Sequence, residues 1–443
     1  MQQWKNSLGV RIQMKLKIKT VTVIGANGTV GKEVSGIFAS FGDAKVYMVS
    51  RNIEKSQKAV DEAALSVKAL SIKENLIPKS MEELKECVEE SDLVFESVSE
   101  NLEIKTQIHQ EINKYMKDTC IVSSGTSGLS IDKLAESYSE NLRENFYGIH
   151  FFNPPYNLTL CELIPSKYNN QNKKALNDLK KYLENKLFRS VIIVKNEPAF
   201  IGNRIGFKFM NEALQYAEKY KEQGGVDYID AILGSYTGRN MPPIKTADFV
   251  GLDIHKAIVD NIYSETEGEE KESFKLPEYV NKLIKNNKLG VKVNEGLYKK
   301  DNNKTFVYDI KTGKYREKNK YNFEFKNKAI SNFKKANYIE GFNHIIEDTT
   351  EESKICLTFL LKYIIYSIEI AQKFGEKISD CDIAMATGFN WIPPLSLIKA
   401  LGGKKETIKL CQKYLDNNQN YEALFQSIKD SNFDFRKYIK AKD

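Results

Sequence analysis

The sequence lacks the features that define several classes of protein. Its six cysteines are scattered and none forms a CxxC pair, so they predict neither a disulfide framework nor a zinc site. The most apolar stretch, residues 355–371, is interrupted by Lys362 and Glu369, which favours a buried helix over a membrane span. The net charge of +7 over 443 residues is modest and spread out, which suits anionic ligands but does not argue for nucleic acid. We therefore expect a cytoplasmic globular protein with no metal site.

Histidine is also scarce, with four in the chain, and one of them stands in an informative pattern. His150 follows a short apolar strand predicted at 146–149 and precedes a turn that contains two prolines, and Glu162 begins the next apolar run. Imidazole titrates near neutral pH, and a carboxylate that holds one ring nitrogen stabilises the imidazolium. The pair has the parts of an oriented general base. A histidine that only caps a strand end fits the same residues, and without further context it is the better interpretation.

The first 19 residues are basic, and no acidic residue occurs before Glu33. This composition has a faint similarity to a transit peptide, but it lacks the length and serine content of one, and it has no apolar core of a secretion signal. An N-terminal extension, residues 1–13, before a core that begins near Met14 is the favoured interpretation.

Strands and helices alternate over the first half of the chain. Strands are predicted at 20–24, 45–49, 92–98, 120–123 and 190–194, and helices at 29–41, 52–66 and 102–116. This alternation is typical of a doubly wound, largely parallel sheet. After residues 196–198 strand patterns nearly vanish, apart from a hairpin over 305–316, and helical periodicity dominates to the end. We place the domains at 14–197, 198–300 and 301–443.

The helical half has an internal repeat. A long helix, an aspartate, a glycine and a Pro-Pro pair occur in this order twice, with the Pro-Pro pairs at 242–243 and 393–394. One such match arises readily by chance, but the shared order favours a duplication. The sequence thus predicts two all-α domains related by duplication.

Three glycines join the first predicted strand to its helix. Gly25, Gly28 and Gly31 follow the spacing GxxGxxG, one residue longer than the usual GxGxxG. Glycines at this position let the backbone approach a pyrophosphate whose charge then lies at the helix N-terminus. The pattern predicts a dinucleotide site, and the alternative is a tight strand–helix turn without a ligand.

The end of the second strand bears on the choice of cofactor. An NAD site normally has an acidic residue there that binds the ribose hydroxyls. This chain instead has Ser50 and Arg51, followed by Lys55 and Lys58. A hydroxyl and a guanidinium favour a 2′-phosphate, which a carboxylate would repel. The pattern slightly favours NADP over NAD, unless these residues are only the solvated basic start of a helix.

The motifs together resemble one family. The chain is similar to the L-3-hydroxyacyl-CoA dehydrogenases, and more closely to the dehydrogenase part of bacterial long-chain β-oxidation proteins with two C-terminal helical domains; the crotonase-like part is missing. The resemblance covers nearly everything from Met14 onward and implies a Rossmann-type α/β domain. The matching segments, in family order, are 100–105, 123–128, 150–154, 200–204, 250–253 and 296–299.

The resemblance implies a role for each of four catalytic residues. His150 would exchange a proton with the C3 hydroxyl of the substrate while hydride passes between C3 and the nicotinamide, and Glu162 would orient His150. Ser127 would hydrogen-bond the reacting oxygen, and Asn203 would help to polarise it. Without the family, Ser127 and Asn203 would be interpreted as helix caps.

The resemblance also implies that Glu100 and Lys105 lie near the cofactor ribose and nicotinamide.

The sequence departs from the family pattern at three places. Ser50 and Arg51 replace the acidic residue, and Gly125 stands where the family commonly has Asn. The segment 52–92 is shorter than the helical lobe that contributes to coenzyme A binding in the family.

The resulting prediction is an oxidoreductase that converts (S)-3-hydroxyacyl-CoA and NAD(P)+ to 3-oxoacyl-CoA and NAD(P)H, in fatty acid β-oxidation or related acyl-CoA metabolism. The second helical domain would replace a partner subunit's domain, so we expect a monomer or a homodimer. One alternative is a dehydrogenase of a 3-hydroxy acid without coenzyme A, which the short segment 52–92 favours. The other is a cofactor-binding structural protein without activity, which the complete set of four catalytic residues opposes.

Overall fold

The computed structural model describes residues 16–169, 173–302, 304–415 and 419–441, so the predicted N-terminal extension lies outside the described residues. The chain divides into two compact units. Unit 1 comprises the residues up to Thr126 together with Ile131–Val191, and unit 2 comprises Ser127–Ser130 together with the residues from Ile192 onward. The short segment Ser127–Ser130 thus belongs to the second unit although it lies within the sequence of the first.

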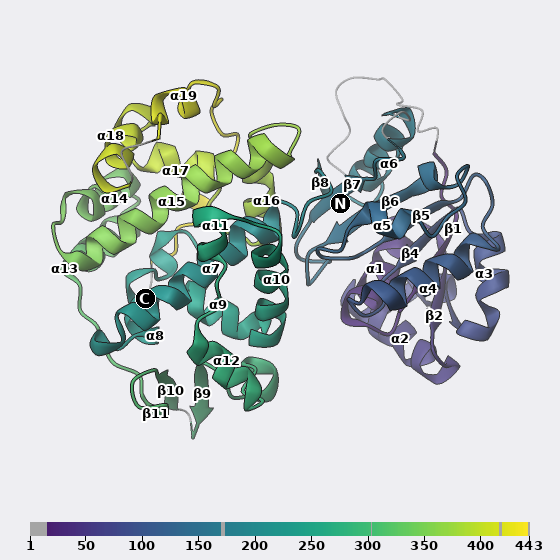
Figure 1. Cartoon of the computed structure of the whole chain (residues 1–443), viewed down its shortest axis with the longest axis horizontal. Coiled ribbons are helices and arrows are strands. Elements are labelled where there is room, and N and C mark those ends of the chain that lie inside the picture. Colours follow the sequence, from purple (N-terminus) through teal and green to yellow (C-terminus); the bar gives the residue numbers. More distant parts are fainter. Residues whose placement is uncertain (1–15, 170–172, 303, 416–418, 442–443) are drawn as a thin grey trace. The chain divides into compact units, whose positions relative to one another are not determined.

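An eight-stranded sheet with the order β3-β2-β1-β4-β5-β6-β7-β8 forms the centre of the α/β region (Figure 1). Its strands are β1 (Thr20–Ile24), β2 (Lys45–Ser50), β3 (Leu76–Ser80), β4 (Leu93–Glu96), β5 (Ile121–Ser124), β6 (Phe146–Phe151), β7 (Leu160–Pro165) and β8 (Ser190–Ile193). The pairs from β3 to β6 are parallel, and β6 pairs with β7 in the antiparallel direction. The central strands β1, β4 and β5 are buried almost throughout because both faces of the sheet are covered.

One strand of this sheet was not predicted. The edge strand β3 has the sequence LIPKS, in which only Leu76 is buried. Pro78 cannot donate a ladder hydrogen bond, so proline in a strand is confined mainly to sheet edges, where the sequence signal for a strand is weakest. The other predicted strands of the α/β domain agree with the structure within two residues at each end.

The helices of this region are α1 (Thr29–Ser40), α2 (Ile53–Ser66), α3 (Leu84–Glu90), α4 (Leu102–Asn113), α5 (Ile131–Ala135) and α6 (Lys173–Asn185). The strand order reverses next to β1, and right-handed crossovers then place α1 and α2 on one face of the sheet and α3 and α4 on the other. In such sheets, ligands bind beyond the carboxyl ends of the strands at the reversal point. The carboxyl ends of β1 and β4 therefore mark the expected cofactor site.

Unit 2 is mostly helical. Its helices are α7 (Gly202–Lys219), α8 (Val226–Ile232), α9 (Pro243–Val250), α10 (Leu252–Ser264), α11 (Gly268–Ser273), α12 (Glu278–Lys285), α13 (Glu324–Lys334), α14 (Tyr338–Glu347), α15 (Glu351–Phe374), α16 (Asp380–Gly388), α17 (Pro394–Ala400), α18 (Lys404–Tyr414) and α19 (Tyr421–Gln426). The predicted hairpin is part of a three-stranded antiparallel sheet of β9 (Tyr298–Asp301), β10 (Lys304–Asp309) and β11 (Lys314–Glu317). The predicted fold class, an α/β domain followed by a helical region, is confirmed.

The two helical repeats pack against each other reciprocally. Helix α7 of the first repeat contacts α16 of the second, and α15 of the second contacts α8 of the first. The repeated aspartate has the same function in both, since Asp230 accepts hydrogen bonds from the first turn of α9 and Asp382 accepts one from the first turn of α17. This reciprocity is the pattern of an isologous dimer contained in one chain.

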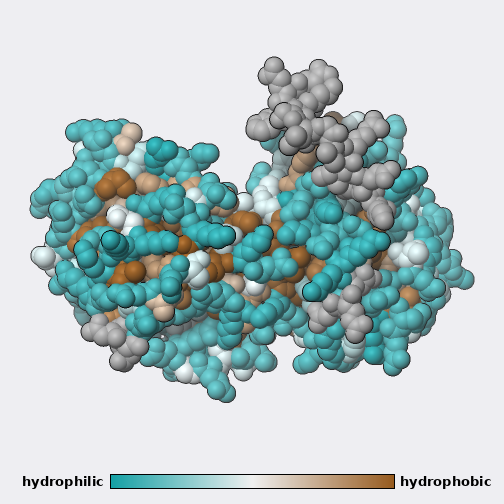
Figure 2. All heavy atoms as spheres, turned by 90° about the horizontal axis from the view of Figure 1, so that it is seen from above, coloured by the Kyte–Doolittle hydropathy of each residue, from teal (hydrophilic) through white to brown (hydrophobic). Residues whose placement is uncertain are grey.

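Helix α15 is the most apolar helix of unit 2. It is long and apolar enough to pass a length-and-composition test for a membrane span, but 72% of its most apolar window is buried inside the structure. Burial of this kind is typical of a core helix. On the face shown in Figure 2, each unit has a mostly hydrophilic surface with smaller apolar areas.

Candidate active site

The glycine loop between β1 and α1 folds back onto neighbouring strands. The N–H groups of Gly25 and Ala26 both donate to the carbonyl oxygen of Val49, at 2.9 and 3.1 Å. Gly25 has a φ of +81°, and a Cβ there would collide with the Ser97 carbonyl. A Cβ at Gly31 would collide with the Gly25 carbonyl, so the loop closes tightly only with glycine at both positions.

The helix that follows this loop offers its first N–H groups to a ligand. Gly28 is the N-cap of α1 and has no side chain to satisfy those groups, and no acidic side chain lies in the first turn. The helix dipole adds partial positive charge at the same place. The loop and helix start therefore fit the pyrophosphate of a dinucleotide.

Of the two residues predicted to bind the cofactor at the end of β2, Ser50 is already hydrogen-bonded to neighbouring residues. The buried Ser50 hydroxyl donates to the Asn52 carbonyl at 2.9 Å and lies 2.5 Å from the Ser56 hydroxyl, which in turn donates to the Lys79 carbonyl. Arg51 is exposed and, within the described ranges, forms no ion pair. Of the two residues predicted to bind a 2′-phosphate, Arg51 is the one with its donors available.

A buried polar cluster lies at the carboxyl end of β4, and its centre is a residue that the sequence analysis missed. Glu96 is fully buried and accepts hydrogen bonds from Lys105 Nζ at 2.8 Å, the Ser124 hydroxyl at 2.6 Å and the Val98 N–H at 2.6 Å. His109 Nε2 lies 3.3 Å from Glu96 Oε2. Burial alone would raise the pKa of Glu96, but His109 and Lys105 hold it at about 2. Glu96 is therefore a fixed negative charge that joins β4, β5 and α4.

Lys105 is buried within this cluster, 1% exposed. Besides Glu96, its Nζ contacts the Val98 carbonyl at 3.3 Å and Glu100 Oε2 at 3.5 Å. The Thr126 hydroxyl donates to the other oxygen of Glu100 at 2.5 Å. The structure thus brings the predicted pair Glu100 and Lys105 together, with Glu100 as the exposed member and Lys105 as its internal support.

Gly125, one of the departures from the family, is explained by its surroundings. Its N–H donates to the Glu96 carbonyl at 2.8 Å, and a Cβ there would lie 2.7 Å from the Phe95 ring. The aromatic ring therefore occupies the space that a side chain at position 125 would need. The turn after β5 stays close to β4 because this position is glycine.

His150 and Glu162 form the predicted pair on adjacent strands. They face each other in the register of β6 and β7, and His150 Nδ1 lies 2.8 Å from Glu162 Oε2. Both side chains are buried, and the Phe152 ring meets the imidazole edge-to-face at 4.6 Å. Because the carboxylate only accepts, Nδ1 carries the proton and Nε2 of the neutral ring remains the basic nitrogen.

The other two predicted catalytic residues, Ser127 and Asn203, belong to unit 2. The segment Ser127–Ser130 is held there by the Asn261 amide, which donates to the Gly128 carbonyl at 3.2 Å, and by the Asn196 amide, which donates to the Ser130 hydroxyl at 3.3 Å. Asn203 lies in the first turn of α7 and is 6% exposed. The four predicted residues are therefore divided between the two units, two on each.

The missed members of the buried cluster had a weak signal in the sequence. Glu96 lies inside the strand predicted at 92–98 and ends β4 at the edge where ligands are expected, and His109 lies one helical turn after Lys105 on α4. Tyr138, whose hydroxyl is 2.7 Å from His109 Nδ1, is 29 residues further along and had no signal at all. In the described part of the chain, no group of three or more His, Cys, Asp or Glu side chains could hold a metal ion.

Comparisons with known proteins identify the family. Residues 20–197 match the family described as 3-hydroxyacyl-CoA dehydrogenase, NAD binding domain, and residues 200–300 match its C-terminal domain. The chain belongs to the 3-hydroxyacyl-CoA dehydrogenase family. The family predicted from the motifs is thereby confirmed. The α/β region of this chain is an NAD-binding domain of that family.

Individual relatives extend this result. The mitochondrial hydroxyacyl-coenzyme A dehydrogenase of Sus scrofa is 30% identical over 301 residues, which cover 64% of this chain and 92% of that protein. A probable 3-hydroxyacyl-CoA dehydrogenase of Bacillus subtilis is 32% identical over 76% of this chain, but the match spans only 42% of that protein. The structure of 3-hydroxybutyryl-CoA dehydrogenase from Escherichia coli K12 aligns over 93% of this chain and 98% of its own, with a TM-score of 0.68 and 19% identity. At that identity it shows the fold alone, and the fold includes the second helical repeat.

Proposed function

We propose that this protein interconverts (S)-3-hydroxyacyl-CoA and 3-oxoacyl-CoA with a nicotinamide cofactor, in fatty acid β-oxidation or related acyl-CoA metabolism. The observation that carries the proposal is the buried His150–Glu162 pair, with 2.8 Å between Nδ1 and Oε2, in a chain of this family. The reaction needs a base of this kind, because the C3 hydroxyl loses its proton while hydride leaves C3 of the same alcohol.

The proton path follows from the tautomer of His150. Glu162 accepts the Nδ1 proton, so Nε2 is the atom that takes the proton of the C3 hydroxyl during oxidation and returns it during reduction. The buried carboxylate of Glu162 stabilises the imidazolium that forms. Ser127 and Asn203 supply a hydroxyl and an amide that bind the C3 oxygen and favour the charge that develops on it.

When bound, the nicotinamide cofactor supplies the acceptor or donor of hydride. In the proposed complex, Gly25, Gly28 and Gly31 hold its pyrophosphate at the start of α1. Glu100 and Lys105 would lie near the cofactor ribose and nicotinamide, and Lys105 would hold Glu100 in place from inside the domain.

We further propose a preference for NADP over NAD. The exposed guanidinium of Arg51 supports it, because a 2′-phosphate accepts two hydrogen bonds from an unpaired arginine. Ser50 contributes less than predicted from the sequence, since its hydroxyl proton is used by the Asn52 carbonyl. Arg51→Ala should weaken NADPH binding by about tenfold or more and leave NADH binding nearly unchanged. Equal losses for both cofactors would contradict a phosphate-binding role.

The central test is the reduction of acetoacetyl-CoA and longer 3-oxoacyl-CoA substrates, with NADH and NADPH side by side. We expect turnover in wild type and a loss of about 10²- to 10⁴-fold in kcat for His150→Gln. His344→Gln is the matched control, because His344 lies on α14 in unit 2 and its side chain is 26% exposed. Full activity in His150→Gln would contradict the mechanism.

The short segment 52–92 supports a second candidate, a dehydrogenase of free 3-hydroxy acids. Between residues 52 and 92 the structure has one helix of 14 residues, α2, and one of seven, α3. Turnover of free 3-hydroxybutyrate without turnover of any coenzyme A thioester would establish this alternative. Binding of cofactor without turnover of either class would indicate a structural protein.

We also propose that the protein is a monomer or a homodimer, and that it is cytoplasmic. The reciprocal packing of the helical repeats supports a monomer, because the second repeat covers a surface of the first that would otherwise face a partner. All six cysteines are free and buried, which suits a reducing compartment. Light scattering after size-exclusion chromatography measures the oligomeric state directly.

A further inference from the structure

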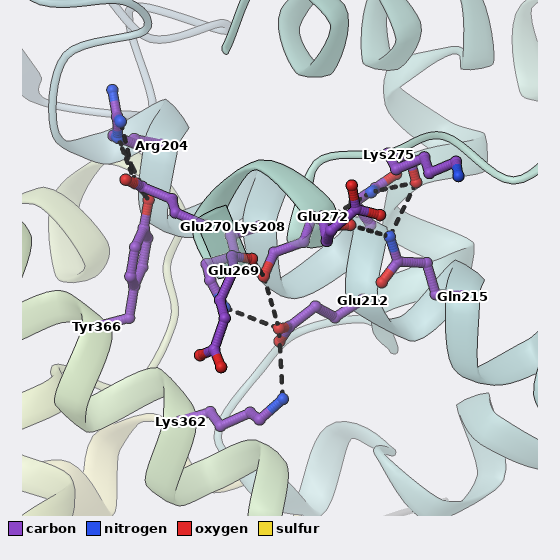
Figure 3. A network of polar contacts seen from close by, with 12 residues as sticks. Arg204, Lys208, Glu212, Gln215, Glu269, Glu270, Glu272, Lys275, Lys362 and Tyr366 are labelled. Carbon is purple, nitrogen blue, oxygen red and sulfur yellow. Dashed lines mark hydrogen bonds and ion pairs between the residues drawn. The ribbon is translucent and has the colours of Figure 1, made fainter. Parts of the chain in front are cut away.

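A network of polar contacts joins the second helical repeat to the start of α7 (Figure 3). We propose that Tyr366, on α15, is a positioning residue for the substrate side of the site. Its hydroxyl contacts Glu270 on α11 and Arg204 on α7. Through these contacts it fixes the first turn of α7, which carries Asn203. This inference rests on the proposed function, because it gives Tyr366 a role only if Asn203 binds the reacting oxygen.

Arg204 anchors the first turn of α7. Its side chain is 3% exposed, and its Nε and Nη2 lie 3.0 and 2.9 Å from Glu270 Oε1 on α11. Its Nη1 donates to the Pro198 carbonyl at 3.3 Å, and the guanidinium stacks on the Phe374 ring with 4.9 Å to the centroid. A buried guanidinium is stable only when its charge is paired, so Arg204 and Glu270 hold each other in one geometry.

Tyr366 completes this anchor from the second repeat. Its hydroxyl donates to Glu270 Oε1 at 2.6 Å and accepts from Arg204 Nε at 3.2 Å. Burial raises the pKa of Tyr366 well above its usual value, so the phenol keeps its proton and remains a donor. Three elements, α7, α11 and α15, thus meet at one carboxylate oxygen.

A second polar contact ties α7 to α15 two helical turns further on. The buried Glu212 lies 2.7 Å from Lys208 Nζ on its own helix and 3.5 Å from Lys362 Nζ on α15 (Figure 3). Both contacts border a groove of about 1300 Å³ between α7, α11 and α15. The two ties fix the axis of α7, but only the one through Tyr366 adjoins Asn203.

The position of an amide that stabilises a transition state must be held to a fraction of an ångström, because small displacements of such groups lower the rate by large factors. The neighbour of Asn203 in the sequence is Arg204, so any rotation of the first turn moves both. In this way a tyrosine of the second helical repeat affects the reaction rate, because it fixes the part of α7 that carries Asn203.

The test uses the full chain with acetoacetyl-CoA and NADH, and compares Tyr366→Phe with Tyr363→Phe. Tyr363 lies on the same helix, is also buried and donates to the Ile392 carbonyl at 2.7 Å, so its phenylalanine variant loses one buried hydrogen bond without touching Arg204. We expect kcat/KM for acetoacetyl-CoA to fall by about tenfold in Tyr366→Phe and by less than about twofold in Tyr363→Phe. The Kd for NADH should stay at the wild-type value in both.

Two further variants separate the possible failures. Glu270→Gln keeps the shape of a partly exposed side chain but removes the charge that pairs with Arg204, so it should also lower kcat/KM without changing the Kd for NADH; circular dichroism compares its fold with that of Tyr366→Phe. Wild-type kcat/KM in Glu270→Gln, or equal losses in the two tyrosine variants, would overturn the positioning role. Asn203→Ala should lose activity more strongly than either tyrosine variant. Full activity in Asn203→Ala would instead refute the part of the proposed function on which the inference rests.

Discussion

Each unit contains a buried carboxylate, and the pKa values of the two are shifted in opposite directions. In the α/β unit, Glu96 lies between Lys105 and His109, and its pKa is about 2. In the helical unit, Asp230 is almost as deeply buried but receives only neutral donors, the N–H groups of Ile244 and Lys245 and the Tyr298 hydroxyl, and desolvation raises its pKa to about 7. The same chemical group is thus a permanent charge in one unit and close to half-protonated at neutral pH in the other.

The difference reflects what each carboxylate does. Glu96 lies where a charged ligand is expected, and a fixed network of charges there orients Glu100 and the turn after β5. Asp230 caps a helix, a task for which partial charge on the N–H groups is enough. Asp382 repeats this in the second helical repeat, where burial raises its pKa to about 6. The capping aspartate is therefore a property of the helical repeat, whereas the buried polar cluster around Glu96 belongs to the end of β4, where the cofactor is expected.

The largest effect on stability should come from a change in the buried polar cluster around Glu96, which is called the charged cluster below. Lys105→Met leaves Glu96 without its ammonium partner inside the domain, and we expect the free energy of unfolding to fall by about 3–5 kcal/mol. Lys114→Met, at the end of the same helix, removes an exposed pair with Glu111 and should change the free energy of unfolding much less. Urea unfolding followed by circular dichroism measures both. Similar losses for the two variants would remove the distinction between the charged cluster and an ordinary surface pair.

A smaller effect, with a defined sign, concerns the pH dependence of the helical unit. Because the pKa of folded Asp230 is raised to about 7 from 3.8, the folded state keeps a proton that the unfolded state has lost between these pH values. Stability from this group is therefore complete below pH 3.8 and declines as pH rises to 7, by at most about 1.4 kcal/mol per pH unit. Asp230→Asn should remove this decline in unfolding experiments between pH 4.5 and 7.

Asp253→Asn is the control of opposite sign. Although desolvation opposes it, the ion pair with Lys292 lowers the pKa of Asp253, so its contribution is present at neutral pH and declines as pH falls through the acidic range. Its replacement should leave the slope between pH 4.5 and 7 unchanged. An unchanged slope in Asp230→Asn itself would mean that this carboxylate is not the group that is protonated.

The smallest effect should come from the outer edge of the charged cluster. Tyr138→Phe removes the hydroxyl that lies 2.7 Å from His109 Nδ1 and should lower the free energy of unfolding by about 1 kcal/mol. The Kd for NADH should not change, because Tyr138 reaches the cluster only through His109. A loss as large as that of Lys105→Met would extend the essential part of the cluster to Tyr138, in the turn after α5.

Much of the α/β fold could be predicted from the sequence. The strand at 20–24, the glycine loop and helix α1 depend on neighbours in the chain, and apolar runs with glycine between them allow few alternatives. The pairing of His150 with Glu162 could also be predicted, since twelve residues with a proline turn between them place the two on adjacent strands. The edge strand β3 could not, because one buried residue and a proline are too weak a signal.

The sequence by itself determined the family, the glycine loop after β1 and the His150–Glu162 pair, because each depends on short motifs of residues close together in the chain. Only the tertiary structure decided that Glu96 is a fixed charge, that Ser127 belongs to the helical unit, and that Tyr366 reaches Arg204 over 162 positions. The physical reason is that burial, ion pairing and hydrogen bonding depend on distance in space. The partners that set the pKa of Glu96 and anchor the first turn of α7 come from other elements of the fold.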